Sequence, residues 1–203
     1  MSKPIQITKP ALLIGEGRDE EKFFTAFVDA LGLSACVQVT EYGGKNALKG
    51  FLSALAAIPP LKALGITRDA DSDFSAALKS VDTAIQAVNL PDSVEVKSFI
   101  LPKENTSGAL EALVLEAAAT TSAWPCVERF MECVAPKDAA PLSPTEKDKR
   151  QIHVWLSTLS KPELRLGEAA LKGLIPFDHQ AFQSLADFIK SLASATEDGS
   201  PHA

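Results

Sequence analysis

This 203-residue sequence contains few cysteines, has no excess of basic charge and lacks long apolar runs. The three cysteines are odd in number and form no CxxC pair, which excludes a disulfide framework and a zinc ribbon. No stretch approaches the roughly 18 apolar residues of a membrane span, and the first residues lack the apolar segment of a signal peptide. We therefore expect a cytoplasmic protein that has no membrane partner.

The balance of acidic and basic residues indicates which partners the protein is suited to bind. Acidic residues outnumber basic ones 26 to 20, which gives a formal net charge of −6. A protein that grips duplex nucleic acid by itself usually carries a basic face, and the one basic cluster here is the short run of residues 147–150. The overall charge therefore does not support a nucleic-acid partner, although metal ions at an acidic site would offset it locally.

The first half of the sequence alternates short apolar runs with amphipathic stripes. Four runs are typical of strands, at residues 11–14, 36–40, 63–67 and 94–101, and a helical pattern follows each of them. This alternation is typical of parallel βα units with right-handed crossovers. We predict an α/β domain over residues 8–120, with a four-stranded parallel central sheet flanked by helices.

The second half changes character. Residues 135–149 are rich in Pro, Lys, Asp and Ser, which predicts an exposed loop. Two helical stripes follow, one from Ile152 to Leu159 and one from Phe182 to Leu192. We predict a helical C-terminal extension over residues 121–195 that packs on the first domain, and a disordered polar tail over residues 196–203.

Acidic residues follow the first and third predicted strands, at the edge where parallel sheets bind ligands. Glu16 follows the first strand between two glycines, and Asp69 and Asp71 follow the third. Two acids at one strand end repel each other unless something binds between them, and Mg²⁺ prefers oxygen ligands. We predict that these three residues form a Mg²⁺ or Mn²⁺ site bordered by Glu20. For Glu16, the alternative is a loop carboxylate that favours a helix N-terminus.

Further residues border the same predicted edge. Gly43, Gly44 and Lys45 follow the second strand; glycines and a lysine at a helix start suit a phosphate, and the alternative is a turn with a solvated lysine. Asp73 either adds to the site or caps the next helix, and we favour the cap. Glu111 either brings another carboxylate to this edge or is a surface residue in a first helical turn.

The motifs in their order resemble a known family. Leu-Ile-Gly-Glu-Gly at residues 13–17, Gly-Gly-Lys-Asn at 43–46 and Asp-Ala-Asp at 69–71 are similar to a Toprim domain. This metal-binding fold is shared by topoisomerases, primases and OLD-type nucleases. The resemblance implies that Glu16 is an acid/base residue and that Asp69 and Asp71 bind Mg²⁺. It also implies metal binding by Glu20, which stands where OLD-type nucleases place a second glutamate.

The rest of the chain resembles a narrower group. The run that contains Pro102, Gly108 and Glu111 is similar to small stand-alone bacterial Toprim-related proteins without assigned activity. The helical tail with Trp155 and Gly167 also resembles that group. The sequence departs from the wider family at residue 15, where glycine replaces the usual aliphatic residue before the glutamate.

Two functional hypotheses follow. The first is an enzyme for Mg²⁺-dependent phosphodiester hydrolysis or phosphoryl transfer on nucleic acid or nucleotide, in which Lys45 neutralises phosphate charge in the transition state. The second is a non-catalytic module in which the same pocket holds a metal and a nucleotide or other phosphorylated ligand, and which acts with a protein partner. The carboxylate set favours the first hypothesis, and the net charge of −6 favours the second.

Overall fold

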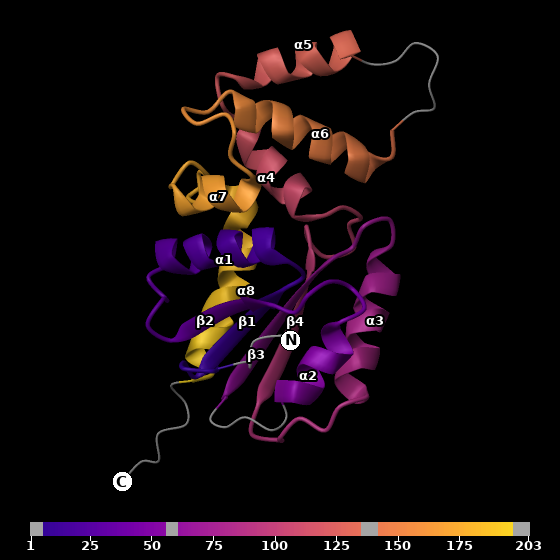
Figure 1. Ribbon diagram of the computed structural model, residues 1–203, viewed down its shortest axis with the longest axis vertical. Helices are drawn as coiled ribbons and strands as arrows, with labels where there is room; N and C mark the ends of the chain where they lie inside the picture. The colour runs from indigo at the N-terminus through magenta and orange to yellow at the C-terminus, as the bar shows by residue number, and fades with distance from the viewer. Residues whose placement is uncertain (1–5, 56–60, 135–141, 197–203) are drawn as a thin grey trace.

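A computed structural model describes residues 6–55, 61–134 and 142–196 (Figure 1). The strands are β1 (Ala11–Gly15), β2 (Val37–Glu41), β3 (Ala63–Asp69) and β4 (Glu95–Leu101). The helices are α1 (Arg18–Ala30), α2 (Leu48–Leu55), α3 (Phe74–Gln86), α4 (Leu110–Ala118), α5 (Trp124–Val134), α6 (Pro144–Ser157), α7 (Leu166–Leu171), the short 3₁₀ helix Gln180–Phe182, and α8 (Gln183–Ser194). Within these ranges no helix is both long and apolar enough to cross a membrane. Residues 197–203 of the predicted tail lie outside the description.

The four strands form one parallel sheet in the order β2-β1-β3-β4. This confirms the predicted α/β class with its four-stranded parallel sheet. The chain passes outward from β1 to β2, returns to the centre at β3 and then passes outward on the other side to β4. The direction of winding therefore reverses between β1 and β3. In open α/β sheets, ligands bind beyond the carboxyl ends of the strands at such a reversal.

The sheet separates two layers of hydrophobic core. On one face, Leu13 and Ala63 pack with residues of α1 and α8, and on the other, Leu12 and Leu64 pack with residues of α2 and α3. The C-terminal helix α8 approaches the sheet closely at Gly65, where a Cβ atom would overlap the side chain of Leu192 in α8. Alternate side chains of the central strands thus bury both faces, which explains their almost continuous apolar sequence.

The helices of the second half share a core with the first. Trp155 in α6 is fully buried in the same cluster as α1, and the ring centroid of Phe177 lies 4.8 Å from that of Phe27 in α1. Gly167 in α7 donates its backbone N–H to Asp19 Oδ1 at 3.1 Å. Figure 1 shows α4, α5 and α6 stacked beyond the carboxyl ends of the strands. The domain boundary at residue 120 stays a prediction, and the described residues on its two sides pack together.

The loop predicted over residues 135–149 is wrong for residues 144–149, because α6 begins at Pro144. The signal for this start is local: Ser143 Oγ accepts from the N–H of Glu146, and the Glu146 carboxylate accepts from the N–H of Ser143. This capping box, with proline in the first turn, is a recognised helix start. The polar composition concealed it, since the buried stripe of α6 begins only at Ile152. Residues 135–141 lie outside the described residues.

Candidate metal centre

Three carboxylates meet beyond the ends of β1 and β3, at the reversal point of the sheet. Glu16 follows β1, Glu20 lies in the first turn of α1, and Asp69 is the last residue of β3. One oxygen from each lies within 4.8 Å of the others. Glu20 reaches back so that its Oε2 accepts from the N–H of Glu16 at 2.5 Å. Gly15 leaves room for this, because a Cβ atom there would lie 3.0 Å from Glu20 Oε2. We call these three residues the carboxylate cluster.

Helix α4 holds Asp69 from the opposite side. The Oδ1 atom of Asp69 accepts from the N–H of Leu110, the first residue of α4, at 3.0 Å. The N-terminus of a helix favours a negative charge. The segment before α4 is joined to the strand end by two backbone hydrogen bonds between Asp71 and Gly108, each of 2.7 Å. The loop after β4 therefore places a helix N-terminus against the cluster.

The environment disfavours the charged form of each cluster carboxyl. Burial, followed by the charges of Glu111 and Glu16, raises the pKa of Asp69 to about 7. Burial and the charge of Asp69 raise the pKa of Glu20 well above its ordinary value. Burial also raises the pKa of Glu16, although nearby basic side chains oppose the effect. A bound cation would supply the positive charge that the surroundings of these carboxylates lack, and it would stabilise their ionised form.

Two buried atoms at the cluster lack hydrogen bonds. Among the described residues, neither Glu16 Oε2 nor Arg68 Nε has a hydrogen-bond partner, and the two atoms lie 4.0 Å apart. Buried polar atoms nearly always have a partner, so this carboxylate oxygen is available to a ligand. The other donors are also carboxylate oxygens, which hard cations prefer. The cluster therefore fits a divalent cation such as Mg²⁺ or Mn²⁺.

Asp71 differs from its prediction. The sequence grouped it with Glu16 and Asp69, whereas its carboxylate forms an ion pair with Lys45, and Glu20 is the third member of the cluster. The prediction placed both aspartates directly after the third strand, where their carboxylates would converge on one cation. However, β3 ends at Asp69, and Asp71 has a left-handed backbone with a φ of 50°. The turn after the strand therefore directs the second aspartate to a different partner.

Two other predicted carboxylates have separate roles. Asp73 caps α3, because its Oδ1 accepts from the N–H of Ala76 at 2.9 Å. The sequence favoured this helix cap over a place in the metal site. Asp73 therefore caps α3 and is not part of the carboxylate cluster. Glu111 lies in the first turn of α4, and its negative charge helps to raise the pKa of Asp69. Glu111 is therefore close enough to act on the cluster electrostatically.

The loop after β2 borders the cluster as predicted. Gly43 and Gly44 have φ values of 88° and 96°, which favour glycine, and the N–H of Gly44 donates to the Glu16 carbonyl at 2.8 Å. Lys45 follows them in a turn, and α2 begins only at Leu48. The lysine therefore precedes the helix instead of lying in its first turn, and its ammonium group is held by the Asp71 carboxylate.

Two residues near the cluster escaped the sequence prediction. Arg68 stands in β3, its side chain is 11% exposed, and its charge lowers the pKa of Glu16 against the effect of burial. Tyr42 is buried, and its hydroxyl donates to the Thr67 carbonyl at 3.3 Å. Burial and the charges of the nearby glutamates raise the pKa of Tyr42. An arginine within an apolar strand, and the chain's one tyrosine directly after another strand, were the available signals.

A family profile described as "Protein of unknown function (DUF3226)" matches residues 10–194. The chain belongs to the DUF3226 family. The matched DUF3226 region runs from β1 to the end of α8, so it contains both the carboxylate cluster and the helices of the second half. No curated protein and no solved structure matches the sequence. The resemblance of this DUF3226 member to Toprim domains stays a prediction.

Proposed function

We propose that this protein is a Toprim-like, Mg²⁺-dependent enzyme that hydrolyses phosphodiester bonds or transfers phosphoryl groups on nucleic acid or nucleotide. The observation that supports the proposal is the carboxylate cluster at the reversal point of the sheet, with a buried Glu16 oxygen that lacks a partner. Mn²⁺ suits the same donors. A cytoplasmic location is part of the proposal, and the three free cysteines agree with it.

The side chains at the site suit this chemistry. Glu16, Glu20 and Asp69 would hold the cation, which supplies Lewis-acid stabilisation of phosphoryl charge and an activated water. The charges of Lys45 and Arg68 both act on Glu16, and in this proposal the two side chains present positive charge to a phosphate in the transition state. The buried Glu16 oxygen that lacks a hydrogen-bond partner suits a residue that accepts or donates a proton.

The alternative is a non-catalytic module that binds a metal together with a nucleotide or other phosphorylated ligand and regulates a protein partner. The net charge of −6 favours this reading, because it opposes the approach of nucleic acid. The ion pair between Lys45 and Asp71 also favours it, since the pair neutralises a cation that would otherwise face a phosphate. Both hypotheses need the same metal site, and they differ in whether product forms.

Turnover on single-stranded DNA, duplex DNA, RNA and nucleotides, with Mg²⁺ or Mn²⁺, tests the proposal. We expect metal-dependent product from the wild type and a loss of about 10²- to 10⁴-fold in Glu16→Gln. The matched control is Glu95→Gln, which alters an exposed glutamate at the amino end of β4 and should retain activity. Metal binding without product from any substrate would support the alternative. Absence of metal binding would contradict both hypotheses.

A further inference from the structure

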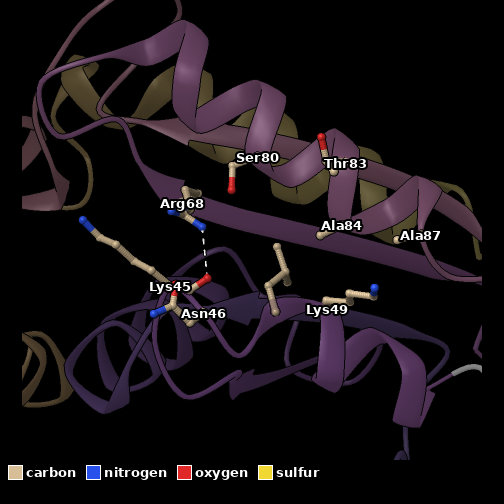
Figure 2. A pocket seen from close by; sticks show the side chains of 9 residues that line it. Lys45, Asn46, Lys49, Arg68, Ser80, Thr83, Ala84 and Ala87 are labelled. Carbon is tan, nitrogen blue, oxygen red and sulfur yellow. Dashed lines mark hydrogen bonds between the residues drawn. The ribbon is translucent and has the colours of Figure 1, made fainter.

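A second charged region lies beside the carboxylate cluster, in a cavity of about 210 Å³ between α2 and α3 (Figure 2). Its polar lining consists of Lys45, Asn46, Lys49, Arg68, Ser80 and Thr83, and the rest is leucine and alanine. Three of the lining residues are basic, and none of the lining residues described is acidic. A concave surface with this composition favours an anion.

Several polar side chains that line the cavity have hydrogen-bond donors or charges that are not fully used in contacts within the protein. The Nη1 atom of Arg68 donates to the Lys45 carbonyl at 3.4 Å, whereas its buried Nε has no partner. Lys49 is exposed, and no carboxylate of the described residues lies within ion-pair distance of it. In Figure 2 the Ser80 hydroxyl points from α3 into the space between the two helices. Thr83 is different, because its hydroxyl donates to the Lys79 carbonyl of its own helix.

The cavity and the carboxylate cluster are contiguous. Lys45 lines the cavity and pairs with Asp71, and Arg68 lines the cavity while its Nε lies 4.0 Å from Glu16 Oε2. One ligand with two linked phosphates would therefore place one at the carboxylate cluster and its neighbour among the cavity's lysine, arginine and serine side chains. Arg68 would lie between the two groups.

The lining also limits what the cavity recognises. Its volume of about 210 Å³ is below the roughly 300–1,000 Å³ of pockets that enclose a whole drug-sized ligand. No aromatic side chain is among the described lining residues, so none is available to stack on a nucleobase. A site of this size and polarity suits a phosphate group and not a complete nucleoside.

We infer that this cavity is a phosphate pocket that holds a non-reacting phosphate of a nucleic-acid strand, next to the phosphodiester at the carboxylate cluster. The inference rests on the proposed function and names its substrate class. A strand is favoured over a nucleoside polyphosphate because contacts to successive phosphates need no recognition of the base. A local basic pocket also allows an acidic protein to bind a strand despite its net charge of −6.

Titration with inorganic phosphate, followed by amide NMR in EDTA, tests the pocket without metal or turnover. We expect shifts at the start of α2, the end of β3 and the pocket side of α3. Lys49→Gln should weaken phosphate binding by about fivefold, since it removes one exposed charge. The matched control Lys190→Gln removes an exposed lysine from α8, on the other face of the sheet, and should leave the affinity unchanged. Absent binding, shifts elsewhere, or equal weakening in both variants would overturn the inference.

Competition in EDTA between a short single-stranded oligonucleotide, a nucleoside triphosphate and a mononucleotide tests the substrate class. We expect the oligonucleotide to bind most tightly and to lose affinity in Lys49→Gln but not in Lys190→Gln. Tighter binding of the triphosphate would overturn the assignment to a strand. A separate Mg²⁺ titration keeps the two proposals distinguishable. If phosphate does not bind but Mg²⁺ does, the phosphate pocket is wrong and the metal site stands. If wild-type Mg²⁺ binding fails while phosphate binds in the cavity, the metal-dependent hypotheses are wrong and the pocket stands.

Discussion

The carboxylate cluster and the phosphate pocket have opposite charges and a common border, but they differ in burial. The cluster is enclosed by β1, β3, α1 and α4, and burial is the largest cause of the raised pKa of each of its carboxyls. In the pocket, Lys49 is exposed, and the side chain of Lys45 is 46% exposed. An enclosed charge costs far more free energy than one that faces water. We therefore expect metal and pH to act on stability through the cluster and scarcely through the pocket.

The largest expected effect is stabilisation by the metal. At a Mg²⁺ concentration of 100 times its Kd, the free energy of unfolding should rise by about 2.7 kcal/mol, because the metal binds the folded state. Asp69→Asn should lose most of this increment, since it removes a charged ligand, whereas Lys49→Gln should keep it. Denaturation in EDTA and in excess Mg²⁺ measures both. A full increment in Asp69→Asn would show that the metal does not bind at the cluster.

The second effect is the pH dependence of stability in EDTA. The pKa of Asp69 is about 7 in the folded protein, and an unfolded aspartate has a pKa of about 3.9. Between these values the folded protein keeps a proton that the unfolded chain has released. Stability should therefore fall as pH rises from about 4 to about 7, by at most about 1.4 kcal/mol per pH unit for this group, and then level off.

The variant Asp69→Asn removes this contribution together with the effect of the Asp69 charge on the pKa of Glu20. Other carboxyls, such as those of Glu146 and Glu168, have a lowered pKa and act in the opposite direction at lower pH. Urea denaturation of the wild type and the variant across this range gives the difference between their free energies of unfolding. The stability of the wild type relative to the variant should decline with rising pH. A difference that is constant or increases would contradict the burial of an uncompensated Asp69.

A smaller effect is expected at the border between the two regions. Asp71→Asn removes the ion pair with Lys45, whose two side chains are 39% and 46% exposed. Such a pair contributes less than about 1 kcal/mol, so the apo protein should lose no more than that. The variant should also retain most of the Mg²⁺ increment. If the increment disappears as it does in Asp69→Asn, Asp71 is a metal ligand, as the sequence predicted.

The smallest effect is expected within the phosphate pocket. Lys49→Gln should change the free energy of unfolding in EDTA by less than about 0.5 kcal/mol, because the side chain is exposed and has no ion pair among the described residues. Urea denaturation beside the wild type measures the change. A loss of several kcal/mol would show that this lysine supports the fold, and the contrast between the regions would fail.

Features that depend on local pattern were predictable. Apolar runs that alternate with amphipathic stripes predicted the parallel sheet, and the positions of Glu16 and Asp69 after the first and third strands predicted their meeting at one edge. One local signal was overlooked. The capping box of Ser143 and Glu146 marks the start of α6, but the polar composition around it led to the prediction of a loop. Composition averages over many residues, whereas a helix start depends on two or three hydrogen bonds.

The sequence by itself determined that carboxylates follow two strands of a parallel sheet, because strand and helix periodicity are local properties of the chain. The tertiary structure alone decided that Asp71 does not join the carboxylates with which the sequence grouped it. Glu20 joins the cluster because Gly15 permits its close approach, and Asp71 is diverted by a left-handed turn. The strand order, the N-terminus of α4 at Asp69 and the cavity between α2 and α3 depend on how distant segments pack. Contacts across such sequence separations leave no periodic signal for a single sequence to reveal.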